Sequence, residues 1–169
     1  MSEAEVVDRV EILFAVEGHR QHFSVEIGPR VTVIEFASLA AKAGGLEEPV
    51  EIFLEDAEQA LTADLVLLEH LADEFAPLHI ARPGEIETTV DFNGRDAKRK
   101  FKPNATIIKI IAWAISPKAL NLEGTPSDFQ LKFDGEVLPP DLHLGQVARG
   151  KKAISLSLVF KVKPQGDRA

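Results

Sequence analysis

The sequence predicts an α+β protein made of two consecutive units of one plan, each a mixed sheet with one helix packed across it. Three observations favour this class. The same order of strands, turns and one helix occurs on both sides of Pro83-Gly84. Strand-like alternation and helix-like periodicity occur in both halves, and a proline followed by a glycine indicates a connection between them. We therefore expect one domain over 1–83, a second over 84–162 and an extended tail over 163–169.

Each unit is expected to begin with a β-hairpin. The segment 10–16, VEILFAV, alternates in the way a half-buried strand does, and 21–27 returns after a turn at Gly18. In the second unit, 86–92 is followed by Asn93-Gly94. This pair is typical of two-residue hairpin turns because both residues tolerate positive φ. The two glycine turns are therefore equivalent.

A helix is expected after each hairpin. Thr32 and Thr106 are the predicted N-caps because a threonine hydroxyl can accept a hydrogen bond from an unpaired backbone N–H. The first helix should end at Gly44-Gly45 and the second at or before Ser116, ahead of a proline. Apolar residues at helical spacing should face the sheets, and these are Val33, Phe36 and Ala40 in the first helix and Ile107, Ile110 and Ala114 in the second.

Further strands follow each helix. We expect a strand within 50–56 and another within 129–135, then an irregular segment, then closing strands at 78–82 and 154–162. A helix that follows a hairpin has to lie across one sheet face to bury its apolar side. The closing strand then pairs most simply in parallel with the first strand. This order is the β-grasp arrangement, and it occurs twice.

Each half resembles a ubiquitin-like domain, and the second half more clearly. The segments that carry the resemblance are KPNATIIKIIAWAI at the helix, FQLKFDGEVLP at the following strand and turn, and PDLHLGQVARGKKAISLSLVF up to the last strand. A tandem pair with a glycine-containing tail is similar to bacterial multi-ubiquitin-like antiphage modifiers and to the interferon-induced two-domain modifier of vertebrates. We favour the bacterial group because the sequence diverges far from the eukaryotic proteins.

The resemblance implies that the reactive group is the carboxylate of Gly166, exposed when the Gly166–Asp167 bond is hydrolysed and the last three residues leave. A terminal glycine has no Cβ to obstruct attack on its carbonyl. Lys163, Pro164 and Gln165 would be the residues that enzymes recognise, with Pro164 stiffening the tail. Ubiquitin ends in two glycines and this tail has Gln165-Gly166, so the implied enzymes are dedicated ones. An inert, frayed tail is the alternative.

The resemblance also implies the partners. An activating enzyme would adenylate the carboxylate with ATP and take it as a thioester, a conjugating enzyme would pass it to an amine of a target protein, and a zinc metalloprotease would trim the tail. A phage virion protein is the implied target. We expect no catalytic residue, no metal and no cofactor in this chain, so it is not an enzyme. The rival hypothesis is an unconjugated interaction scaffold, and a sulfur carrier is a third.

The second predicted helix is apolar around most of its circumference. Besides the side that should face the sheet, it carries a second apolar stripe that a wide core would explain equally well. We predict that this stripe contacts the other lobe or a partner protein. Its residues are Ile108, Ile111, Trp113 and Ile115.

Charge is divided unevenly between the halves. Residues up to Pro83 include 17 acidic and 5 basic side chains, and those from Gly84 onward include 10 acidic and 14 basic ones. Lys98, Lys100 and Lys102 should line one strand face and suit an acidic groove on an activating enzyme, or simply protect a sheet edge. The basic excess is small and lies beside an acidic neighbour, so nucleic-acid binding is not expected.

Several other classes are excluded or disfavoured. The chain has no cysteine, which excludes disulfides and thiolate metal sites. No segment approaches the roughly 20 apolar residues of a membrane span, and the acidic N-terminus lacks a signal-peptide core. We therefore expect a cytoplasmic protein that binds no membrane. No nucleophile elbow, phosphate-binding loop or dinucleotide fingerprint is present.

Overall fold

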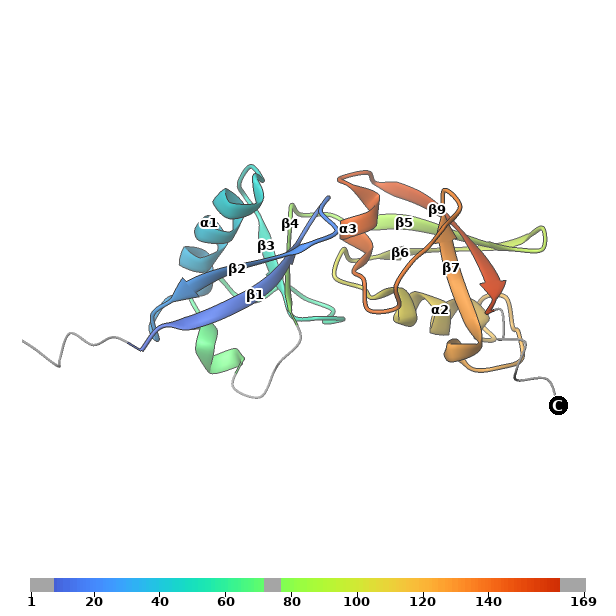
Figure 1. The fold of residues 1–169 in the computed structure, drawn as a ribbon, viewed down its shortest axis with the longest axis horizontal. Helices are drawn as coiled ribbons and strands as arrows, with labels where there is room; N and C mark the ends of the chain where they lie inside the picture. The colour runs from blue at the N-terminus through green and yellow to red at the C-terminus, as the bar shows by residue number, and fades with distance from the viewer. Residues whose placement is uncertain (1–7, 72–76, 162–169) are drawn as a thin grey trace, which may run out of the picture.

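The computed structural model describes residues 8–71 and 77–161 and contains two sheets, each covered by one helix (Figure 1). The first sheet has the strand order β2-β1-β4-β3. The first lobe consists of β1 (Val10–Val16), β2 (His22–Ile27), α1 (Val33–Gly44), β3 (Glu51–Phe53), the 3₁₀ helix η2 (Leu67–His70) and β4 (Leu78–Ala81).

The second lobe repeats this plan with one more strand. Its sheet has the order β6-β5-β9-β7-β8. Its elements are β5 (Ile86–Phe92), β6 (Arg95–Phe101), α2 (Ile107–Ile115), the 3₁₀ helix η3 (Pro126–Asp128), β7 (Phe129–Phe133), β8 (Glu136–Val137), α3 (Leu144–Ala148) and β9 (Ala153–Phe160).

The strand pairing is that of the β-grasp fold. β1 runs antiparallel to β2 and parallel to β4, and β5 has the same relation to β6 and β9. In the second hairpin Asn93 and Gly94 have φ of 51° and 86°, as a two-residue turn requires. The prediction of two tandem β-grasp domains is therefore confirmed.

Both helices begin at the predicted threonines. In α1, the Thr32 hydroxyl accepts a hydrogen bond from the N–H of Glu35, and the Glu35 carboxylate accepts one from the N–H of Thr32. This reciprocal pair satisfies two N–H groups that the helix itself leaves unpaired. The helix ends at Gly45, whose φ of 73° gives the left-handed cap that glycine adopts easily.

The predicted inward faces form the two cores. Val33, Phe36 and Ala40 are buried beneath the first sheet. The corresponding residues of α2, Ile107, Ile110 and Ala114, have no exposed surface at all. Burial of one such large side chain contributes about 1.5–3 kcal/mol relative to its exposure, so these faces fix each helix on its sheet.

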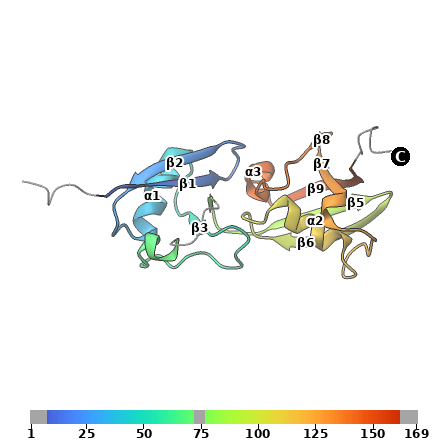
Figure 2. The same ribbon diagram turned by 60° about the horizontal axis from the view of Figure 1, so that its bottom comes forward.

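The second lobe covers part of the first sheet on the face opposite α1. Ala15, His79 and Phe53 are paired across β1, β4 and β3 and so lie in one row on that face. All three are at most 1% exposed, whereas Leu13, two residues along β1, is 45% exposed. In both views α3 stands at this junction beside the first sheet (Figure 1; Figure 2). The two lobes therefore share a packed boundary.

Candidate functional site

The predicted conjugation and processing residues lie outside the described part of the chain. Gly166 and Asp167 are among them, as are Lys163, Pro164 and Gln165. The last residue that the structure describes is Lys161, which follows β9. The proposed chemistry of the tail therefore stays a prediction, and the structure defines the surface from which that tail departs.

An aromatic cluster surrounds the end of β9. The Phe160 ring stacks on Phe129 with centroids 4.8 Å apart, and Phe92 meets Phe160 edge-on at 5.7 Å. Phe129 is buried, but Phe160 is 60% exposed. β9 ends at the side of the second lobe that is remote from the first lobe (Figure 1). The end of β9 is therefore accessible and carries an exposed aromatic ring.

An apolar groove of about 490 Å³ lies next to this point. It runs between α2 and the segments that flank β7 and β8. Lys161, the last residue that the structure describes, is among those that line it, so the groove adjoins the end of β9. The residues that line it include Ile108, Ile111, Phe129, Val137, Leu138 and Lys161.

The four predicted interface residues separate into two groups. Ile111 and Ile115 belong to the core of the second lobe. Trp113 is half-buried against that core and meets Phe101 edge-on at 5.5 Å. Ile108 is 37% exposed and lines the groove. The hydrogen bonds and ion pairs between the lobes come from other residues, and the contact of this stripe with the other lobe or with a partner protein stays a prediction.

The opposite face of the second sheet is polar. Along β9, Ala153, Ser155 and Ser157 are exposed while the intervening residues point into the core. Lys98 and Lys100 are exposed on β6, which is an edge strand of this sheet. Lysines on an edge strand discourage pairing with other chains. The exposed apolar surface of this lobe is therefore on the side of the groove.

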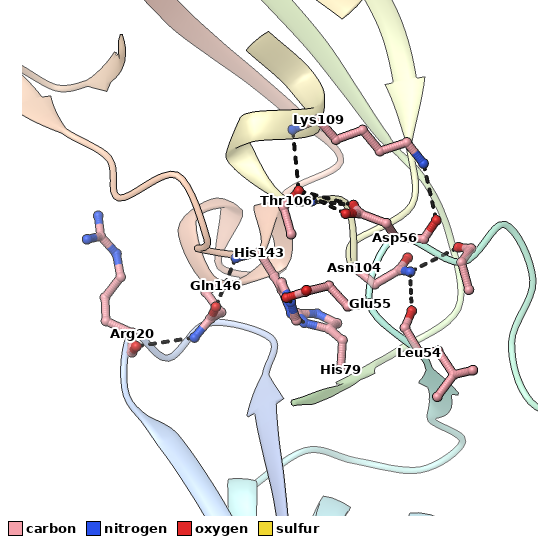
Figure 3. Close-up of polar contacts among 11 residues, drawn as sticks. Arg20, Leu54, Glu55, Asp56, His79, Asn104, Thr106, Lys109, His143 and Gln146 are labelled. Atoms are coloured by element: carbon pink, nitrogen blue, oxygen red, sulfur yellow. Dashed lines mark hydrogen bonds and ion pairs between the residues drawn. The ribbon is translucent and has the colours of Figure 1, made fainter. Parts of the chain in front are cut away.

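A polar seam, which sequence analysis did not identify, joins the two lobes. The Asp56 carboxylate of the first lobe accepts hydrogen bonds from the backbone N–H of Thr106, at 2.8 Å, and from the Thr106 hydroxyl, at 3.0 Å. The Lys109 ammonium donates a hydrogen bond to the Asp56 carbonyl at 3.2 Å and forms an ion pair with Glu58 at 3.4 Å. Asp56, Thr106 and Lys109 come together at the start of α2 (Figure 3). Asp56 thus caps a helix of the other lobe.

Two histidines meet in the same seam. Nδ1 of His79 lies 2.9 Å from Nδ1 of His143, and Nε2 of His143 lies 2.8 Å from the Glu55 carboxylate. Both rings are fully buried. Burial lowers the pKa of His79 well below its ordinary value of 6.5, and the neighbouring His143 lowers that pKa further. The lowered pKa favours the neutral form of His79. Figure 3 shows His79 and His143 beside Glu55.

Two buried amide side chains complete the seam. The Asn104 amide donates to the carbonyls of Leu54 and Ala57, at 2.8 and 2.9 Å. The Gln146 amide donates to the carbonyls of His19 and Arg20. Buried polar groups are costly unless they are paired, so these four hydrogen bonds favour one fixed arrangement of the lobes.

Two other features are absent from the residues that the structure describes. Among residues 8–71 and 77–161, histidine, aspartate and glutamate do not form a group of three or more that could hold a metal ion. The helices in those two ranges are too short or too polar to cross a bilayer.

Comparison with known proteins supports the fold. Residues 87–161 match the family model described as BilA ubiquitin-like domain 2. The chain has a ubiquitin-like fold. A solved structure of ubiquitin from Caldiarchaeum subterraneum is 17% identical to it, with a TM-score of 0.39, over 47% of this chain and 98% of the other. No curated protein sequence matches the chain.

Proposed function

We propose that this chain is a protein modifier that is trimmed after Gly166 and then joined through the Gly166 carboxylate to an amine of a target protein. The observation that carries the proposal is the match to BilA ubiquitin-like domain 2, which spans the second lobe and ends at Lys161, just before the predicted tail. The exposed end of β9, remote from the first lobe, supports it because an enzyme could enclose the tail from that side.

The chemistry takes place at one carbonyl carbon. Water first replaces the Asp167 nitrogen at the Gly166 carbonyl, which leaves a free carboxylate and releases the last three residues. ATP then converts the carboxylate to an acyl adenylate with loss of pyrophosphate, and a cysteine thiolate of the activating enzyme displaces AMP. The thioester passes to a cysteine of the conjugating enzyme. An amine finally attacks it, forms an isopeptide bond and releases the thiol. The modifier supplies only the electrophile and the binding surfaces.

The biological role that we propose is bacterial antiphage defence in the cytoplasm. The resemblance to bacterial multi-ubiquitin-like modifiers supports this role. A processing metalloprotease, an activating enzyme and a conjugating enzyme are the proposed partners, and a phage virion protein is the proposed target.

The first test measures the mass of the chain after proteolysis and then the formation of its thioester with the activating enzyme. Co-expression with the proposed processing metalloprotease should remove Asp167 to Ala169 and nothing further. With ATP and the cognate activating enzyme, the trimmed chain should form a thioester that thiols break. Gly166→Ala and a chain stopped at Gln165 should lose this thioester, whereas a chain stopped at Gly166 should form it without the protease.

A tandem scaffold that is never conjugated is the second candidate. The buried polar seam favours it, because a fixed arrangement of two lobes suits a protein that holds two partners at a set spacing. Unchanged mass with an active protease, together with no thioester from a chain stopped at Gly166, would support the scaffold against the modifier.

A further inference from the structure

We infer that the groove beside the tail is the docking site for an apolar side chain of the protease that cleaves after Gly166. This inference rests on the proposed function and extends it by assigning the surface that selects the substrate. Its basis is the coincidence of three features on the second lobe, namely the start of the tail, the groove, and the apolar side chains that this lobe leaves exposed.

The exposed apolar side chains of the second lobe are not scattered. Among its described residues, the large apolar side chains that are exposed are Ile108, Val137 and Phe160, at 37%, 42% and 60%. Ile108 and Val137 line the groove, and Phe160 stacks on Phe129, which lines it as well. Apolar residues gathered around one depression are typical of a binding surface, whereas single exposed ones need no explanation.

The length of the tail sets how far away the protease can be. Gly166 is five positions along the chain from Lys161, which lines the groove. An extended chain spans at most roughly 3.6 Å per residue, so the Gly166 carbonyl lies within roughly 18 Å of Lys161. A protease that encloses this bond must place part of its surface within that distance, so the groove lies within its reach.

The predicted recognition residues of the tail, Lys163, Pro164 and Gln165, offer polar contacts and a rigid proline. Gly166 has no side chain, and the residues before it are Pro164 and Gln165. Affinity in protein complexes comes mostly from a few buried anchors near the centre of an interface. These tail residues include no large apolar side chain that could serve as such an anchor, so an apolar anchor would come from the folded surface. The groove is the apolar concavity that adjoins the tail.

The test is the kcat/KM for cleavage of the whole chain at Gly166–Asp167. Ile108→Asp places a charge in the groove at an exposed position and should lower kcat/KM at least about tenfold, the loss expected for an interface anchor. Ile34→Asp is the matched control, because Ile34 holds the same position in α1 after its own N-cap threonine and is 58% exposed. It should be cleaved like the wild type.

Cleavage of a peptide of residues 158–169 measures recognition of the tail without docking on the folded lobe. The peptide should be cleaved far less efficiently than the folded chain. Cleavage of Ile108→Asp at the wild-type rate would overturn the inference, and so would an equal loss in Ile34→Asp, which would indicate a general effect on folding. Faster cleavage of Ile108→Asp would also overturn it, because the groove would then hold the tail itself. Failure of the wild type to be cleaved would instead refute the proposed function.

Discussion

Asp56 links the two lobes through a single carboxylate. In α1 the third helical residue is Glu35, whose carboxylate accepts the N–H of the N-cap Thr32 at 2.9 Å. In α2 the same position is Lys109, which has no acceptor to offer the N–H of Thr106. Asp56 supplies that acceptor from the first lobe at 2.8 Å. The start of the second helix therefore depends on a residue of the other lobe.

Asp56→Gly should lower the free energy of unfolding by about 1–3 kcal/mol. Loss of an N-cap partner costs about 0.5–2 kcal/mol, and an unpaired buried N–H costs about 1–3 kcal/mol. Glycine is the appropriate replacement because Asp56 has a φ of 60°, which glycine adopts without strain. Urea denaturation at neutral pH measures the change.

Glu58→Ala is the control for this substitution. Glu58 pairs with the same Lys109, but its side chain is 77% exposed. Exposed ion pairs contribute about 0–1 kcal/mol, so this variant should unfold nearly as the wild type does. Equal losses in the two variants would show that the cap does not depend on the Asp56 carboxylate.

At the scale of elements, β4 and the start of α3 meet through two imidazole rings, those of His79 and His143. A consistent assignment has Nδ1–H of His79 donating to Nδ1 of His143, and Nε2–H of His143 donating to the Glu55 carboxylate. Nε2 of His79 is then an acceptor, and it has no hydrogen-bond partner among the residues that the structure describes. A proton added to that nitrogen would create a buried cation with no partner for its new N–H.

The free energy of unfolding should therefore fall as the pH drops below about 6.5. The pKa of His79 is lower in the folded chain than in the unfolded chain, so between those two values the unfolded chain binds more protons. Stability is complete above the unfolded pKa and decreases toward the folded one, by at most about 1.4 kcal/mol per pH unit for one such group. Urea denaturation at pH 7.5 and at lower pH values measures this slope.

Two histidine variants test the assignment to His79. His79→Gln should be less stable at neutral pH and should have a weaker dependence on pH than the wild type. His22→Gln, at an exposed position of β2, should keep the wild-type dependence. A wild-type slope in His79→Gln would assign the pH dependence to other groups.

The regular elements were predictable from the sequence, whereas the seam was not. Hairpins, helices and parallel pairing follow from local periodicity, turn residues and the need to bury one helix face. β8 has two residues and α3 has five, too few for a periodic signal. Asp56 occupies a turn, as expected of aspartate, and its partner is 50 residues away. One signal was available, since Lys109 stands where the first helix has Glu35.

On the scale of the whole molecule, the two lobes are not equivalent. The outer face of the first sheet is partly buried by the second lobe, while the outer face of the second sheet is exposed and polar. The lobes approach closely at Gly145, whose carbonyl accepts the N–H of Gly18 at 2.9 Å. A Cβ on Gly145 would lie 2.6 Å from Nε2 of His79 and 2.9 Å from Cβ of Pro103. This close contact of α3 with the first lobe, which we call the joint, therefore requires glycine at position 145.

Gly145→Ala should weaken the joint and let the lobes tumble separately. Alanine favours a helix over glycine by about 1 kcal/mol, so α3 alone would become more stable. Overpacking of a closed contact typically costs about 1–3 kcal/mol, and here relief requires movement of β4 away from α3. We therefore expect a lower free energy of unfolding and, in ¹⁵N relaxation, different rotational correlation times for the two lobes.

Separate tumbling distinguishes loss of the joint from local strain against Pro103, which would leave the lobes moving together. Ser155→Ala, on the exposed face of β9, should keep the single correlation time of the wild type. A Gly145→Ala chain that is more stable than the wild type and still tumbles as one body would show that the joint accommodates a Cβ. The other contacts between the lobes would then suffice to hold them together, and the spacing between their outer surfaces would not depend on the close approach at α3.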